Sequence, residues 1–342
     1  MKLGIVGLAS CGKTTFFNAL TQKEPSSKPS SKELNLGVVT VIDNRLDFLE
    51  KLYSAKKNVP ATIEFIDIAG TNKSLLSSVR EVDALVHVVR CFGHDVEPIR
   101  DIEAINLEFV LSDLGILEKR ITKTTKEAKA NKALVKEVEL LGKLIAVLED
   151  GKALKSIADE LTTEENAVIH NFGLLSSKPV IYVANVALED VAKKSSFVQQ
   201  IKEFAALTNS TTLDICAQIE EEIAALPPQE RGLFLDELGI TKSGLERLVA
   251  ESYNILGLMS FLTAGEKEVR AWTIKKGTKA AKAAGKIHSD IERGFIRAEI
   301  VSYDELKAAG TFNEAKKQGV VRLEGKDYIV KDGDVINFRF NV

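Results

Sequence analysis

The feature that most constrains this chain is a phosphate-binding motif close to its N-terminus. Residues 7–14, GLASCGKT, fit the pattern GxxxxGK[ST] and follow an apolar segment, residues 2–7, that is typical of a buried strand. Glycines let backbone N–H groups close around phosphate oxygens, and the helix expected over residues 13–22 begins with a partial positive charge. The motif therefore predicts a strand, a phosphate-binding loop and a helix, with an ordinary glycine-rich turn as the alternative.

The residue types in this motif have separate chemical tasks. Lys13 is expected to reach the β- and γ-phosphates of a nucleotide, and the Thr14 hydroxyl is expected to bind Mg²⁺. The remaining candidate contacts come from the loop and the first helical turn. The candidate phosphate-binding residues are Leu8, Ala9, Ser10, Cys11, Gly12, Lys13, Thr14 and Thr15.

A second candidate element ends the apolar segment over residues 63–68, where the sequence reads DIAG. A carboxylate at this position, Asp67, can hold Mg²⁺ through a water, and the Gly70 amide can contact the γ-phosphate. The alternative interpretation is a strand-end turn without a ligand. Its place after a strand favours the nucleotide site.

The residues that would contact the base are less clearly marked. Ras-like GTPases read guanine with the aspartate of an N-K-x-D motif, and this sequence contains no such motif. The strand expected over residues 180–184 leads instead to Asn185, which is either the candidate base contact or a strand-end turn residue. The missing aspartate disfavours guanine and leaves adenine open.

The pattern along the chain predicts three parts. Strand-like segments that alternate with helical ones, including residues 37–42 and 84–89, predict a parallel, doubly wound α/β sheet. Residues 114–166 lack proline and carry apolar residues at three- and four-residue steps, which predicts a long helical hairpin that turns near residues 124–132. In the last part of the chain, short strands are expected at 268–274, 294–300, 328–330 and 335–340, and a helix at 304–318.

These patterns give an expected domain division. The α/β domain comprises residues 1–115 and 167–257, the inserted helical arm comprises residues 116–166, and a small α+β domain comprises residues 258–342.

Composition narrows the class of protein. The 342 residues include three widely spaced cysteines without a CxxC pair, which argues against a disulfide framework or a zinc ribbon and favours the reducing cytoplasm. No apolar run approaches the ~18–20 residues that a membrane helix needs. The net charge is −3, yet residues 267–297 hold nine basic and three acidic residues, a net charge of +6. This window is either a surface that faces nucleic acid or a solvated face.

With these motifs the sequence resembles the YchF / Obg-like ATPase family, within the translation-factor class of P-loop GTPases. The resemblance covers nearly the whole chain. It is densest at GIVGL (4–8), GKTTFFNALT (12–21), FIDIAG (65–70), REVDALVHVVRCF (80–92) and IYVANV (181–186). Three C-terminal blocks resemble the TGS domain of that family. They are FLTAGEKEVRAWTIKKGTKA (261–280), GKIHSDIERGFIRAE (285–299) and LEGKDYIVKDGDVINFRFNV (323–342).

The resemblance implies a G domain with an inserted coiled-coil arm and a C-terminal TGS (ubiquitin-like) domain. It further implies Mg²⁺-dependent hydrolysis of ATP, of GTP less readily, and association with ribosomes. We expect a monomer that acts in the cytoplasm without a DNA or membrane partner. The alternative is a nucleotide-gated RNA- or ribosome-binding protein with little hydrolysis. A metabolic kinase is the least favoured of the three functions, because the sequence shows no site for a phosphate acceptor.

Departures from the family pattern affect the loop and the metal site. Ala9, Ser10 and Cys11 replace the family's Pro, Asn and Val, and these positions contribute mainly backbone. In the first switch, Ser31 stands where the family has a Mg²⁺-sensing threonine. By this resemblance the expected metal-binding residues are Thr14, Ser31 and Asp67.

Other departures affect the base site and the catalytic loops. By this resemblance the expected base contacts are Asn185, Val186 and Leu188, and Leu188 occupies the position of the glutamate in the family's N-x-x-E motif. Only nine residues separate Gly70 from Arg80, where the family has a longer glycine-rich segment. His94 is a candidate for the histidine that assists hydrolysis in the family. Thr71 stands where Ras-like proteins have the glutamine that orients the attacking water, so slow hydrolysis is expected.

Overall fold

The computed structural model describes residues 1–22, 35–68, 76, 79–191 and 195–341. Its contacts divide the chain into two compact units. The first unit comprises residues 1–38 and 64–248, and the second comprises residues 39–63 and 249–342.

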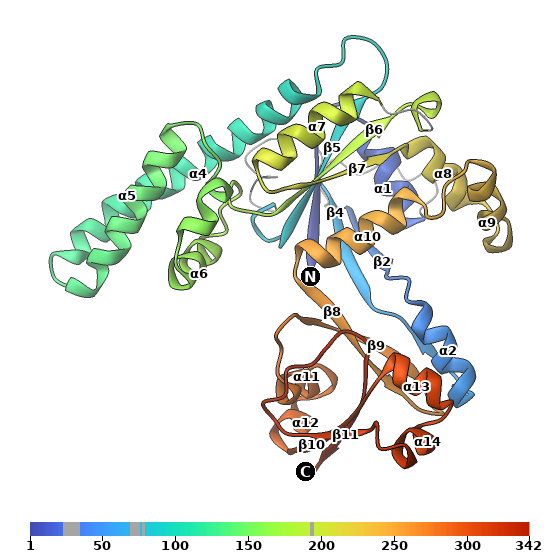
Figure 1. The fold of residues 1–342 in the computed structure, drawn as a ribbon. Helices are drawn as coiled ribbons and strands as arrows, with labels where there is room; N and C mark the ends of the chain where they lie inside the picture. Colours follow the sequence, from blue (N-terminus) through green and yellow to red (C-terminus); the bar gives the residue numbers. More distant parts are fainter. Residues whose placement is uncertain (23–34, 69–75, 77–78, 192–194, 342) are drawn as a thin grey trace. The chain divides into compact units, whose positions relative to one another are not determined.

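A six-stranded sheet with the order β2-β4-β1-β5-β6-β7 forms the centre of the first unit (Figure 1). Strand β1 pairs in parallel with β4 and β5, and β6 pairs in parallel with β5 and β7, which confirms the predicted parallel α/β sheet. Strand β6 is buried along its whole length, as its continuous run VIYVANV predicts for a strand covered on both faces. The strands are β1 (Lys2–Val6), β2 (Asn35–Thr40), β4 (Thr62–Asp67), β5 (Ala84–Cys91), β6 (Val180–Val186) and β7 (Thr211–Ile215).

Helices pack against this sheet and close its core. Helix α1 follows the phosphate-binding loop at the end of β1, and α7 packs on β6 and β7. The boundary between the two units falls within α10. These helices are α1 (Lys13–Thr21), α7 (Ser196–Leu207), α8 (Ala217–Ala225), α9 (Pro228–Glu237) and α10 (Gly244–Ile255).

A helical arm extends from this unit, as the sequence predicts. Helix α4 (Pro98–Ala128) and helix α5 (Val135–Glu149) pack side by side, and the chain turns between them through η1 (Lys132–Leu134) (Figure 1). Helix α4 starts well before residue 114, because one continuous helix of 31 residues serves both the sheet and the arm. Segments η2 (Leu154–Glu160) and α6 (Thr163–Phe172) return the chain to the sheet. The arm has its own apolar core, which includes Leu117, Leu141, Leu144, Leu148 and Ile169.

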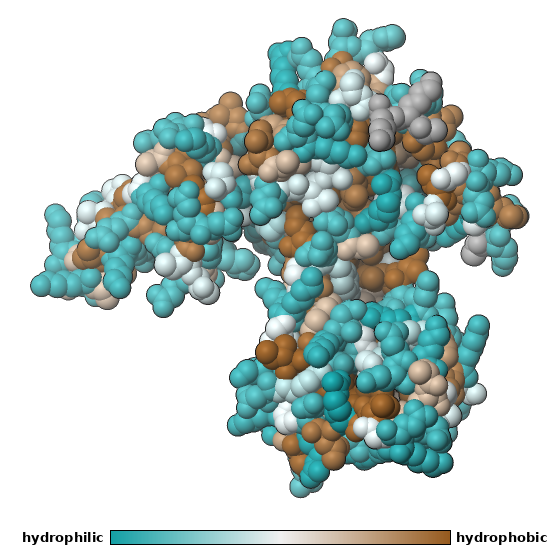
Figure 2. Space-filling view, viewed as in Figure 1, coloured by the Kyte–Doolittle hydropathy of each residue, from teal (hydrophilic) through white to brown (hydrophobic). Residues whose placement is uncertain are grey.

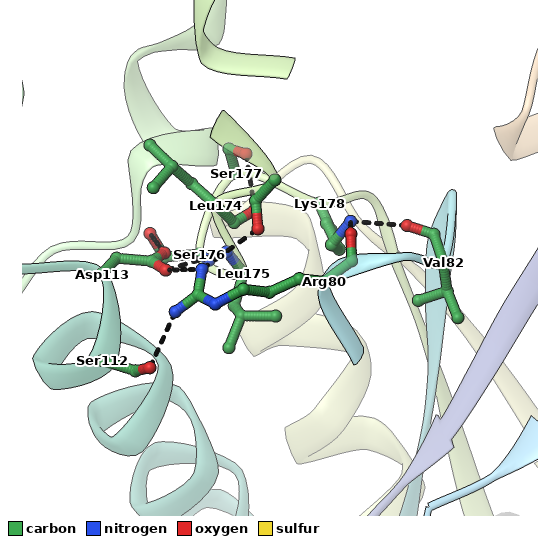
Figure 3. Close-up of polar contacts among 10 residues, drawn as sticks. Arg80, Val82, Ser112, Asp113, Leu174, Leu175, Ser176, Ser177 and Lys178 are labelled. Carbon is green, nitrogen blue, oxygen red and sulfur yellow. Dashed lines mark hydrogen bonds and ion pairs between the residues drawn. The ribbon is translucent and has the colours of Figure 1, made fainter. Parts of the chain in front are cut away.

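A buried ion pair fixes the base of the arm (Figure 3). Asp113 of α4 is fully buried and lies 2.8 Å from the guanidinium of Arg80. Its carboxylate also accepts hydrogen bonds from the backbone N–H of Leu175 and from the N–H and hydroxyl of Ser176. Lys178 donates to the carbonyl oxygens of Arg80 and Val82. These contacts connect α4 to the segment that enters β6.

The second unit contains another six-stranded sheet, with the order β11-β10-β12-β8-β9-β3. Strand β9 pairs antiparallel with β8 and parallel with β3, and β12 pairs antiparallel with β10 and parallel with β8. Strand β8 is absent from the sequence-based prediction. The strands are β3 (Asn58–Val59), β8 (Leu258–Ala264), β9 (Val269–Lys275), β10 (Phe295–Ser302), β11 (Arg322–Glu324) and β12 (Asp334–Phe340).

Residues 39–63 lie in this second unit, whereas the expected division put them in the α/β domain. Helix α2 (Asn44–Tyr53) buries Leu46 and Leu49 in the same apolar cluster as Leu262 and Leu306. The partner residues are about 200 positions or more away along the chain, so local patterning does not reveal the association.

The helices of the second unit correct two further expectations. The single helix expected over residues 304–318 is wrong, because Gly310 ends α13 with a φ of 79° and the Thr311 side chain caps α14. The strand expected over residues 328–330 is only an isolated bridge between Ile329 and Lys279. The helices are α11 (Ala280–Ile287), α12 (Ser289–Arg293), α13 (Tyr303–Ala309) and α14 (Phe312–Lys317). Within the described ranges, we find no helix with both the length and the apolar character of a membrane span.

Candidate nucleotide-binding site

The phosphate-binding loop requires glycine at residues 7 and 12, because neighbouring atoms leave no room for a side chain there. A Cβ on Gly7 would lie 2.4 Å from the carbonyl oxygen of Val88, and a Cβ on Gly12 would lie 2.3 Å from Nδ2 of Asn185. Gly12 also has a φ of 90° at the N-cap of α1, in the region where side chains are strained. The loop thus joins β1 to α1 as the motif predicts, with the N–H groups of the helix end available to an anion.

Lys13 lies at the first position of α1 and folds over the loop. Its ammonium donates hydrogen bonds to the carbonyl oxygens of Gly7 and Leu8, both at 2.7 Å. The positive charge is therefore held at the loop without a carboxylate bound to it among the described residues. This geometry is suited to an incoming phosphate.

Asp67 ends β4 beside β1, where it is in register with Ile5. The carboxyl is buried, and its Oδ1 has no hydrogen-bond partner among the described residues. Burial raises the pKa of Asp67, while the charge of Lys13 and a hydrogen bond from Asn35 oppose that rise. A buried carboxylate oxygen without a partner is costly unless a cation or water satisfies it.

These residues fit a magnesium site. Thr14, in the first turn of α1, and Asp67 supply the oxygen ligands that Mg²⁺ prefers. No group of three His, Cys, Asp or Glu residues that could form a protein cage occurs in the described ranges. The donor set therefore matches an ion that keeps several waters and binds nucleotide phosphates. The predicted contacts Ser31 and Gly70 lie outside the described residues.

Asn185 holds the loop from the side. Its Nδ2 donates to the carbonyl oxygen of Cys11 at 2.9 Å, and its Oδ1 accepts from the backbone N–H of Ala217 at 3.0 Å. The side chain is 4% exposed. It thus links the phosphate-binding loop, the end of β6 and the start of α8. The sequence predicts Asn185 as a base contact but gives no signal for this positioning role, because its partners are backbone groups far along the chain.

The other candidate base contacts lie in different environments. The Val186 side chain belongs to the apolar core of the first unit. Leu188 lies in the short helix η3 (Leu188–Asp190) and is about half exposed, at 49%. The structure therefore brings Asn185 to the phosphate-binding loop, and it buries the Val186 side chain in the core.

The remaining loop residues divide between interior and surface. The Cys11 thiol is buried, and burial raises its pKa, so it is a small interior residue rather than a reactive thiolate. Leu8 packs against the apolar core. Ala9 and Ser10 are exposed, and Ser10 has a positive φ of 62°.

His94 lies in the segment between β5 and α4 and is exposed. Two residues earlier, the ring of Phe92 lies 4.0 Å from the position of a Cβ on Gly12, so this segment starts beside the loop. The described contacts include no hydrogen bond from the His94 side chain. Its part in hydrolysis remains a prediction, and Thr71 lies outside the described residues.

Comparison with known proteins identifies the family. A family model described as a 50S ribosome-binding GTPase matches residues 2–186, and a YchF GTPase C-terminal model, described as a protein of unknown function, matches residues 258–341. A Bacillus subtilis protein named ribosome-binding ATPase YchF is 49% identical, with 99% of each chain covered. This chain belongs to the YchF family.

Other YchF proteins support the assignment. A ribosome-binding ATPase YchF from Escherichia coli O157:H7 is 42% identical over 100% of this chain and 99% of that protein. The solved structure of the Schizosaccharomyces pombe YchF GTPase superposes with a TM-score of 0.90 at 32% identity, and covers 99% of this chain and 97% of its own. The fold is thus confirmed as mixed α/β, with a P-loop GTPase domain and a C-terminal domain.

Proposed function

We propose that this chain is a Mg²⁺-dependent P-loop nucleoside triphosphatase that hydrolyses ATP slowly and acts as a ribosome-associated switch. The observation that carries this proposal is the glycine loop with the Lys13 ammonium above it, beside the Oδ1 of Asp67, which has no partner in the part of the chain that the structure describes. The names of the relatives, which read ribosome-binding ATPase, support it. The chain acts as a monomer in the cytoplasm and uses neither DNA nor a membrane as partner.

Within this site each residue has a defined task. Lys13 neutralises the β- and γ-phosphate oxygens, and the N–H groups of the loop and of Thr15 bind the same oxygens. Thr14, Asp67 and Ser31 would hold Mg²⁺, and Gly70 would contact the γ-phosphate. When bound, Mg²⁺ neutralises charge on the phosphates. Asn185 keeps the loop in place through its bond to the Cys11 carbonyl oxygen.

ATP is expected to bind at least as tightly as GTP. The chain has no N-K-x-D aspartate to accept hydrogen bonds from guanine, and Leu188 offers no acceptor in its place. Competition of unlabelled ATP and GTP against a labelled nucleotide measures the ratio of dissociation constants. A clear preference for GTP would contradict this prediction and would reveal a guanine contact near residues 188–190.

A second function is favoured by one observation. The alignment with the Bacillus subtilis protein extends over 363 positions, more than the 342 residues of this chain, so that relative has residues that this chain lacks. If these belong to the switch segments, the chain is a nucleotide-gated ribosome-binding protein with little hydrolysis. Single-turnover assays with ATP and GTP, with and without ribosomes, separate the two functions. Hydrolysis under any of these conditions supports the ATPase, and nucleotide-dependent binding without hydrolysis supports the alternative.

The C-terminal part is proposed to be a TGS domain that contacts ribosomal RNA. We assign residues 258–342 to it, together with the packed segment 39–63. Residues 1–115, apart from that segment, and 167–257 form the G domain, and residues 116–166 form the arm.

Reversing charge in the basic window 267–297 is expected to weaken ribosome binding. Lys275, Lys276 and Lys279 are exposed where β9 leads into α11. Lys279 also pairs with Asp327 at 2.8 Å. Phosphate contacts release counterions, so replacing all three with Glu should reduce both affinity and its salt dependence. Co-sedimentation with ribosomes at low and moderate salt measures both, and an unchanged affinity and slope would exclude this surface.

A further inference from the structure

The outer end of the helical arm carries a strong positive charge that the nucleotide site does not use. Residues 118–136 contain seven basic and two acidic residues, a net charge of +5 in a chain whose total is −3. All seven basic side chains are exposed, and hydrophilic residues predominate at this end of the arm in the view of Figure 2. The basic residues are Lys119, Arg120, Lys123, Lys126, Lys129, Lys132 and Lys136.

Three of these lysines form a stripe on one side of α4. Lys119, Lys123 and Lys126 are spaced at i, i+4 and i+7, so they lie on one helix face with steps of ~6 Å and ~4.5 Å along the axis. The opposite face buries Leu117 and Thr124 in the arm. The stripe therefore faces away from α5, and its three ammonium groups are open to a partner.

Little of this charge is neutralised within the arm. The guanidinium of Arg120 already has partners within the arm, since it forms an ion pair with Glu137 at 2.8 Å and lies over the ring of Phe172. Lys123 has only a loose pair with Glu127 at 3.8 Å, both largely exposed, and such pairs contribute little. The other five lysines have no ion pair among the described residues. Mutual repulsion between them is relieved when a polyanion binds.

We propose that the lysine stripe Lys119–Lys123–Lys126 is a binding surface for the phosphate backbone of structured RNA. The inference rests on the proposed ribosome association, and it names a second RNA contact on this chain, apart from the proposed contact of the TGS domain. Lys129, Lys132 and Lys136 add positive charge at the turn of the hairpin, at the same end of the arm. RNA presents closely spaced phosphates, which a row of flexible ammonium groups contacts without reading sequence.

The arm lacks the features of a membrane-binding helix. A helix that lies in a membrane interface needs a free apolar face opposite its basic face. Here that face packs into the arm core through Leu114, Leu117 and Ile121.

The test compares two triple variants of the full chain. The first replaces Lys119, Lys123 and Lys126 with Gln, which preserves helix propensity. The control replaces Lys51, Lys202 and Lys242 with Gln, three exposed lysines outside both basic regions with the same change in net charge. Binding to ribosomes and to protein-free ribosomal RNA is measured between 50 and 200 mM salt. Thermal unfolding and ATP hydrolysis without ribosomes verify that both variants fold.

The stripe variant is expected to bind both probes about tenfold more weakly at low salt. The slope of log affinity against log salt should fall by about two to three units, because each phosphate that a lysine neutralises contributes ~0.7–0.9 units to it. The control variant should match the wild type. An affinity and a salt slope equal to those of the wild type in the stripe variant would overturn the proposal and leave the proposed ribosome binding intact. Weaker binding of this variant to ribosomes without weaker binding to RNA would also overturn the proposal. Wild-type binding to RNA but not to ribosomes would reject only the proposed function. Competition by anionic vesicles at equal lipid phosphate would also refute RNA as the partner.

Discussion

Replacing Lys13 with alanine is expected to abolish hydrolysis and to weaken ATP binding by about 10–100-fold. The Lys13 ammonium lies over the loop on the carbonyl oxygens of Gly7 and Leu8, where it is available to the β- and γ-phosphates. A hydrogen bond to a charged group contributes about 1.5–3 kcal/mol, which corresponds to this range of affinity. Calorimetric titration with MgATP and a single-turnover assay measure the two losses.

The fold should survive this change, because within the described ranges the Lys13 side chain makes two hydrogen bonds, both to a loop that Asn185 also holds. Lys242→Ala is the matched control, since Lys242 is an exposed lysine outside the site. Thermal unfolding should give similar midpoints for both variants. Unchanged turnover and affinity in Lys13→Ala would refute the assignment of the phosphate-binding loop.

Replacing Asp113 with alanine is expected to lower the free energy of unfolding by about 3–5 kcal/mol. The change removes a fully buried carboxylate that binds Arg80 and three donors in the segment before β6. The guanidinium of Arg80 keeps bonds to the Ser112 hydroxyl and the Gly173 carbonyl oxygen. Its charge, however, loses the only carboxylate paired with it in the described part of the chain. Denaturant unfolding measures the loss.

Two comparisons test the cause of this loss. Glu118→Ala removes an exposed carboxylate from the same helix and should change the free energy of unfolding by less than ~0.5 kcal/mol. Arg80→Ala together with Asp113→Ala should cost less than the sum of the single changes, because the two residues form one network. A loss below ~1 kcal/mol in Asp113→Ala would show that this ion pair does not hold the base of the arm.

Local features of the sequence predict much of the first unit. The glycine spacing before Lys13 specifies the loop and the start of α1, since few other residues tolerate Gly12's φ or its approach to Asn185. Continuous apolar runs such as VIYVANV specify buried parallel strands. The apolar steps between residues 134 and 148 specify the arm, because that spacing puts one apolar face along a helix. Each of these signals lies within about 20 residues, which is why sequence patterns reveal them.

Some local signals compete with one another. Helical character on both sides of Gly310 suggests one helix over 304–318. The positive φ of Gly310 and the cap at Thr311 divide it into α13 and α14. The Gly-Thr pair is the local signal for this break, because a left-handed glycine ends a helix and a threonine side chain caps the next one.

The sequence by itself determined the family, the phosphate-binding loop, the parallel sheet and the helical arm. The tertiary structure alone decided three other features. Residues 39–63 join the C-terminal sheet through β3 and α2, Asn185 bonds the loop to α8, and Asp113 is paired with Arg80. These contacts join groups that are 32 to more than 200 residues apart, and several involve backbone atoms that every residue type shares. Such pairings leave no periodicity or composition in the sequence, because only the folded chain brings the partners together.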